Sequence, residues 1–87
     1  MKDVVKLENE LTNNFLNKKV DIIMEGDIDY ILKIDNMRFL LNNVNLILSD
    51  EKENQLTICL DEVGDIIVND KVIDIEFNYS VEIKIYV

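Results

Sequence analysis

Hydrophobic and polar residues alternate strictly through the last fifteen positions of the chain, "IDIEFNYSVEIKIYV". Apolar or aromatic side chains occupy every odd position from Ile73 to Val87, and mostly acidic or other polar side chains lie between them. Because successive side chains of a strand point to opposite faces, the pattern predicts strand structure with one buried face and one polar face. Strands usually have five or six residues, so the segment either bends at 78–80 into two strands or reaches beyond its own sheet.

A different period governs the beginning of the chain. Leu7, Leu11 and Phe15 recur at helical spacing after Asp3, which is a suitable N-cap. We therefore expect one amphipathic helix over residues 4–18. Beyond it the apolar residues change to a period of two.

Short polar breaks divide residues 20–87 into strands. The segments expected as strands are 20–24, 28–34, 37–41, 44–48, 56–60, 66–68 and 73–87. Connections this short require antiparallel neighbours, and Gly26 in the first turn is expected to adopt a positive φ. Runs such as "VDIIM" and "NLILS" are apolar on consecutive positions, which indicates strands covered on both faces. The sequence predicts an α+β fold: one N-terminal helix followed by a strongly bent antiparallel β meander or small barrel of about six to seven strands.

Length and composition indicate one small domain over residues 1–87. A chain of this size buries roughly 60 to 65% of the surface that it exposes when unfolded. Cys59 is the only cysteine and cannot form an internal disulfide, so it is expected to be a small buried hydrophobe on a strand. No apolar run approaches the length of a signal h-region or a membrane span. We expect a cytoplasmic protein.

The charge balance is strongly acidic. Eighteen acidic and nine basic residues give a formal net charge of -9. Such a field repels phosphate backbones and anionic membranes and attracts basic surfaces, which argues against direct nucleic-acid or membrane binding. The alternative is that the acids only keep an apolar sheet in solution.

Few residues are suited to catalysis. The chain has no histidine, which excludes Ser-His-Asp, Cys-His and histidine-metal sites. Asp27 with Asp29, and Asp74 with Glu76, lie two residues apart, about 6.8 Å along a strand, and would suit a metal or a two-carboxylate mechanism only within a cleft. The stretch "MEGDIDY" does not match the calcium-loop pattern, and two distant glycines cannot form a phosphate cradle. We expect no enzyme, no cofactor and no metal site.

One segment resembles a known family. "VNLILSDEKE" at 44–53 is similar to the third-strand motif of Sm-like proteins, with Asn45 at the position of the motif asparagine. The resemblance implies a five-stranded bent barrel over 20–68. Leu41 stands where that family has an acidic residue, and "CLDEVG" has no arginine where its second motif has one. A divergent Sm-like RNA binder would need a ring oligomer with a local positive surface.

The hypothesis that we favour is a protein-binding module that docks on a basic surface of a target protein, such as one that normally holds nucleic acid. Small inhibitors of phages and mobile elements, and immunity proteins, often have this size and charge. The candidate partner-binding residues are Asp27, Asp29, Asp50, Glu51, Glu53, Asp61, Glu62, Asp65, Asp74, Glu76 and Glu82. The alternative is a structural protein that self-associates through the edge of its C-terminal strand. Docking through acids should weaken in high salt, whereas backbone edge pairing should not.

Overall fold

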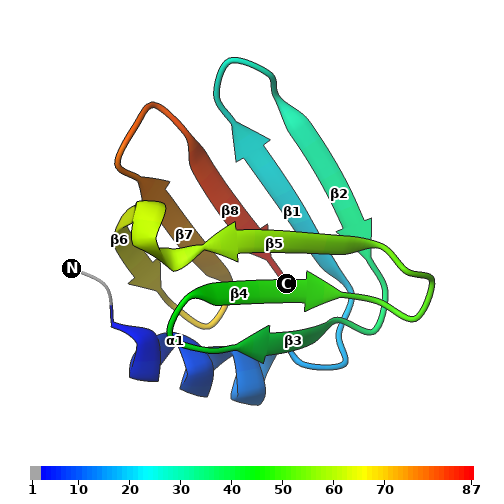
Figure 1. Cartoon of the computed structure of the whole chain (residues 1–87). Coiled ribbons are helices and arrows are strands. Elements are labelled where there is room, and N and C mark those ends of the chain that lie inside the picture. The colour runs from blue at the N-terminus through cyan, green and yellow to red at the C-terminus, as the bar shows by residue number, and fades with distance from the viewer. Residues whose placement is uncertain (1–2) are drawn as a thin grey trace.

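The computed structural model describes residues 3–87 and shows one N-terminal helical segment followed by eight strands (Figure 1). The predicted α+β class is confirmed, with slightly more strands than expected. The helical segment comprises α1 (Val4–Glu10) and a π-helical turn, η1 (Leu11–Phe15). The strands are β1 (Val20–Glu25), β2 (Tyr30–Ile34), β3 (Arg38–Leu41), β4 (Asn45–Ser49), β5 (Gln55–Cys59), β6 (Val63–Val68), β7 (Val72–Phe77) and β8 (Glu82–Tyr86), and a short 3-10 turn, η2 (Leu60–Glu62), precedes β6.

The helix begins where the sequence predicts. The Asp3 carboxylate accepts a hydrogen bond from the Lys6 amide at 2.9 Å and so caps an otherwise unpaired N–H group. Leu7, Leu11 and Phe15 are fully buried. The apolar face of the helical segment therefore packs into the core.

The helix ends earlier than the predicted boundary of residue 18. The Leu16 amide donates to the Leu11 carbonyl at 2.8 Å, a five-residue step that widens the last turn into η1. Asn17 then adopts a φ of 62°, a left-handed conformation that asparagine tolerates and that stops helical growth. Among residues 3–87, no helix has the length and apolar character needed to cross a membrane.

The strands form two antiparallel sheets. The larger sheet has the order β2-β1-β8-β7-β6, and β3, β4 and β5 form the smaller one. The smaller sheet crosses in front of the larger one, and α1 lies along their lower edge (Figure 1). One face of the larger sheet therefore packs on the core, and its outer face is turned away from the smaller sheet.

The C-terminal segment is two strands that bend where the sequence allows, in the turn between β7 and β8. Strand β8 inserts between β1 and β7 and is paired along both edges. A strand whose two edges are occupied cannot add another chain. The prediction of self-association through the C-terminal strand is therefore wrong.

The predicted core face of this segment is correct within the strands. Ile73, Ile75, Ile83 and Ile85 are almost fully buried. Tyr79, at 53% exposure, lies in the turn, and Val87 at 39% follows the last strand, so neither belongs to the core. Cys59 is on a strand as expected, although it is only half-buried.

The barrel implied by the Sm-like resemblance does not form. Residues 44–53 correspond to β4 and the turn after it, while the strands between Val20 and Val68 divide between two sheets. Strands β1 and β6 share a sheet but are separated by β8 and β7. The similarity is therefore local.

Gly26 serves close packing instead of an unusual backbone angle. No glycine in the described chain has a positive φ, contrary to the expectation for the first turn. A Cβ atom at Gly26 would lie 3.1 Å from Cγ2 of Val81. The glycine lets the β1–β2 turn lie against the β7–β8 turn, which forms one end of the site described next.

Candidate functional site

The outer face of the larger sheet carries the polar side chains that alternate with the core residues. From β1, β8 and β7, these are Asp21, Glu25, Glu82, Lys84, Tyr86, Asp74 and Glu76, and the apolar Ile23 lies among them. Each is the strand neighbour of a core or partly buried apolar side chain on the opposite face, such as Ile22 or Ile75.

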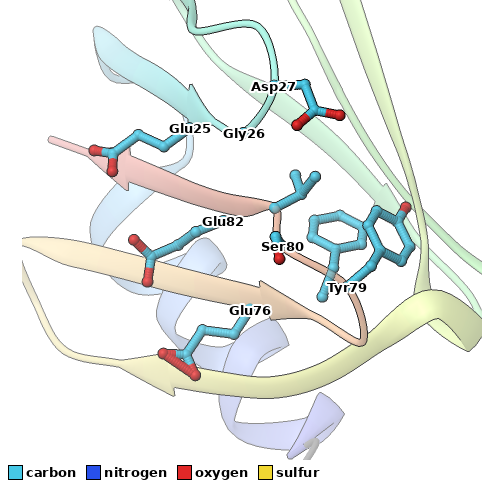
Figure 2. A pocket seen from close by; sticks show the side chains of 9 residues that line it. Glu25, Gly26, Asp27, Glu76, Tyr79, Ser80 and Glu82 are labelled. Carbon is cyan, nitrogen blue, oxygen red and sulfur yellow. The ribbon is translucent and has the colours of Figure 1, made fainter.

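Strand register brings four acidic residues into one row. Glu25 lies opposite Glu82, Glu82 opposite Glu76, and Glu76 opposite Asp65. Neighbouring strands are about 4.8 Å apart, so the row crosses β1, β8, β7 and β6 with a carboxylate at every step. Figure 2 shows Glu25, Glu82 and Glu76 projecting side by side from three adjacent strands. We call these four residues the acidic row.

One lysine of β8 lies beside the acidic row. Lys84 Nζ lies 3.4 Å from Glu82 Oε1, and this carboxylate raises the pKa of the lysine. Asp65 accepts a hydrogen bond from the Ile66 amide at 2.9 Å. Glu25 and Glu76 make no salt bridge with any residue in the described part of the chain. Because like charges opposite each other destabilise a sheet, the row costs folding free energy.

Asp74 places a further carboxyl group beside Glu76 and Glu82. Burial raises its pKa to about 6, and the hydrogen bond and charge of Glu82 and the charge of Glu76 act in the same direction, while Lys84 opposes them. Its Oδ1 atom is buried and has no hydrogen-bond partner among residues 3–87. Protonation of Asp74 removes a buried charge and its repulsion with Glu82 and Glu76. We therefore expect the charge of this part of the face to change near pH 6.

The same group has the donor spacing of a hard-cation site. Oxygen atoms of Asp74, Glu76 and Glu82 lie within 4.8 Å of one another. Calcium binds oxygen at about 2.3 to 2.6 Å, so ligands on opposite sides of one ion are about 5 Å apart. The three side chains could hold such an ion, but partly exposed carboxylates often lie this close without one, so their geometry alone assigns no metal.

A groove adjoins the acidic row where the β1–β2 and β7–β8 turns meet. It has a volume of about 550 Å³. Its lining residues are Glu25, Gly26, Asp27, Glu76, Phe77, Tyr79, Ser80, Val81 and Glu82. Four of these are acidic and none is basic. We call it the acidic groove.

Two aromatic rings form one side of the acidic groove. The ring centroids of Phe77 and Tyr79 lie 5.5 Å apart, with an interplanar angle of 38°. The Tyr79 hydroxyl donates to Glu62 at 2.9 Å, which anchors the turn to η2 and raises the pKa of the tyrosine. Tyr79 and Asp27 lie toward the turns, away from the carboxyl groups of the three glutamates (Figure 2).

The structure brings together some of the predicted partner-binding residues. Asp27, Glu76 and Glu82 line the acidic groove, and Asp65 and Asp74 lie beside it on β6 and β7. Asp29 is exposed in the β1–β2 connection and does not line the groove, and Asp61 and Glu62 lie on η2. Glu62 does not line the groove, but it accepts the hydrogen bond of the Tyr79 hydroxyl, and Tyr79 does line it.

The predicted residues in the longest loop are a separate group with local structural contacts. Asp50 accepts hydrogen bonds from the Asn54 side chain and from the Lys52 and Asn54 amides, and these bonds hold its pKa below the usual value. Glu51 forms a 3.1 Å salt bridge with Arg38. Glu53 adopts a positive φ in the same turn. These three acids shape the β4–β5 turn.

Glu25 was missed as a candidate, although it begins the acidic row. Its carboxylate faces Glu82, which is 57 positions later in the chain. The only local signal is that Glu25 alternates with Ile23 and Asp21 at the end of a strand. Knowledge of the β1–β8 pairing is needed to see its role.

No known protein family, curated protein or solved structure matches the chain. The functional interpretation therefore rests on the site itself.

Proposed function

We propose that the chain is a non-catalytic, cytoplasmic protein-binding module that docks its acidic row and acidic groove on a basic surface of a partner protein. The observation that supports this most is the acidic row, in which Glu25, Glu82 and Glu76 face one another and Lys84 is the one cation beside them among residues 3–87. An arrangement that destabilises the free protein is explained if a cationic partner covers it.

The acidic groove favours arginine as the central contact. A guanidinium group can stack on an aromatic ring and donate two parallel N–H hydrogen bonds to a carboxylate. The groove offers both features, with Tyr79 on one side and Glu76 and Glu82 on the other. An arginine inserted here would be a binding hot spot, since such anchors dominate interface energies.

The charge array resembles what a nucleic-acid-binding surface recognises. Asp74 and Glu76 are spaced along β7, and Glu82 and Glu25 extend the negative charge across the sheet. The carboxylates would bind the basic residues of such a surface in place of the phosphate groups of a nucleic acid. The net charge of -9 adds long-range steering, so association should be fast and should weaken as salt rises.

The experiment that tests this proposal is affinity capture from lysate, at low and high ionic strength, with matched variants. E76Q/E82Q removes two charges from the acidic row, and E51Q/E53Q removes two from the β4–β5 turn. We expect wild type and E51Q/E53Q to retain the same stoichiometric partner at low salt, and E76Q/E82Q to lose it. Added nucleic acid should displace that partner.

Equal capture by E76Q/E82Q would contradict the assignment of the site. Capture that persists at high salt would contradict the electrostatic mechanism. Absence of any stoichiometric partner for the wild type would contradict the function itself.

A further inference from the structure

The two outer strands of the larger sheet differ in how well they are protected. Strand β6 contacts α1 and has an irregular register between Val63 and Asp65, both of which discourage pairing with another chain. Strand β2 pairs with β1 in a regular register and, within residues 3–87, has no second strand on its other side. Its backbone is open to an additional strand.

Exposed apolar side chains lie on this strand and in the connection that leads into it. Ile31 is 63% exposed and Tyr30 52% on β2, and Ile28 is 80% exposed in the connection. The three lie within four consecutive positions. An open, apolar strand edge is a site for strand addition.

We propose that β2 pairs antiparallel with β2 of a second copy of this chain, about a two-fold axis that passes beside Ile31. In this register Ile31 lies opposite Ile31 of the second copy. Lys33 lies opposite Asp29 of the second copy, which directly precedes β2, so the pairing extends the strand by one residue. Two-fold symmetry repeats the charged pair, so both lysines meet an aspartate. Apolar and opposite-charge pairs across strands each stabilise pairing.

The charge pattern selects this register over its neighbours. Centring the axis on Leu32 would place Asp29 opposite Asp35, a pair of like charges. Centring it on Tyr30 would place Ile31 opposite Asp29. At outer-face positions 29–33, the Ile31 register joins apolar to apolar and positive to negative, and neither neighbouring register does both. The Asp27–Asp35 pair that it also creates lies beyond the two ends of β2.

The charges around this edge do not already neutralise Lys33. Asp21 is its cross-strand neighbour on β1, but the two side chains form no salt bridge in the described chain. Lys33 and Asp29 are both exposed. Two molecules that each carry a charge of -9 repel each other overall, so salt should strengthen this dimer.

The test is sedimentation equilibrium of the intact chain over a range of concentrations at low and high salt. The wild type should show a monomer–dimer equilibrium that shifts toward dimer as salt rises. K33D or D29K alone creates like-charge pairs and should weaken dimerisation about tenfold or more. The double variant D29K/K33D restores opposite charges and should recover the dimer.

A control variant, K71D, makes the same charge change as K33D on an exposed residue of the β6–β7 turn and should leave dimerisation intact. A wild type that remains monomeric at every concentration would overturn the proposal. A dimer that survives both single variants, or one that D29K/K33D fails to restore, would overturn the register. Circular dichroism of each variant checks that it is folded.

Discussion

Glu76 on β7 and Glu82 on β8 lie directly opposite each other in the middle of the larger sheet. One step along the same strands, Asp74 lies opposite Lys84, the opposite-charge pairing that stabilises sheets. The Glu76–Glu82 pair breaks that rule, and Glu25 and Asp65 extend it to both sides. Such like-charge pairs lower the stability of the folded protein. We therefore connect the acidic row with binding to a partner.

Removing one charge from the acidic row should stabilise the free protein. E76Q keeps the shape of the side chain and relieves repulsion with Glu82, so we expect a gain of about 0.2 to 1 kcal/mol at neutral pH. The gain should shrink as salt screens the charges. Urea denaturation at two salt concentrations measures both effects. The control E51Q, which loses the salt bridge to Arg38, should show no gain, and a loss of stability in E76Q would contradict the account.

Asp74 should make folding stability depend on pH. Its pKa of about 6 in the folded protein exceeds the ordinary value of 3.8, so the folded state binds more protons than the unfolded state between these values. Stability therefore falls as pH rises through this range, and the loss is complete above pH 6. D74N removes the charge and supplies an amide donor for Glu82.

We expect D74N to gain about 1 to 2 kcal/mol at pH 7, after allowance for solvent screening, and almost nothing below pH 4. Denaturant midpoints of the variant and the wild type over this pH range provide the comparison. A difference that does not change with pH would show that Asp74 is not protonated near pH 6.

Neighbouring isoleucines on β6 test which face of the larger sheet is buried. Ile66 is 7% exposed and Ile67 is 50% exposed. I66A should cost about 2 to 4 kcal/mol, because it leaves a cavity in the core, and I67A should cost under about 1 kcal/mol. Thermal or chemical unfolding separates the two. Equal losses, or a larger loss for I67A, would mean that the register of β6 is wrong.

Glu53 is a site at which glycine should stabilise the protein. Its φ of 70° is costly for a residue with a Cβ atom, and the side chain makes no salt bridge in the described chain. E53G should gain about 0.5 to 1 kcal/mol. The adjacent K52G, where φ is not positive, should lose a similar amount. The prediction fails if both variants lose stability, as measured by urea denaturation.

Local periodicity was sufficient to predict most of the fold. The spacing of Leu7, Leu11 and Phe15 identified the helix, and alternation from Ile73 onward identified the core face of β7 and β8. Both patterns reflect which side of an element is buried, which is a local property of the sequence. The end of the helix was less predictable, because a single left-handed residue, Asn17, determines it.

The arrangement of the strands depends on long-range pairing that no local pattern specifies. Insertion of β8 between β1 and β7 brings Glu25 beside Glu82, and it also removes the edge by which the C-terminal strand was expected to self-associate. Asp74, Glu76 and Glu82 were identified as candidates from alternation alone. Asp50, Glu51 and Glu53 were chosen because they are acidic residues in a long loop, yet their contacts there are structural.

The most direct test of the acidic site is an NMR titration of the isotope-labelled protein with an arginine-rich peptide at low salt. We predict that amide shift changes concentrate at Glu25, Glu76, Tyr79 and Glu82, that E76Q/E82Q weakens them, and that E51Q/E53Q does not. Shift changes centred on the β4–β5 turn, or spread evenly over every acidic residue, would contradict docking at the acidic row.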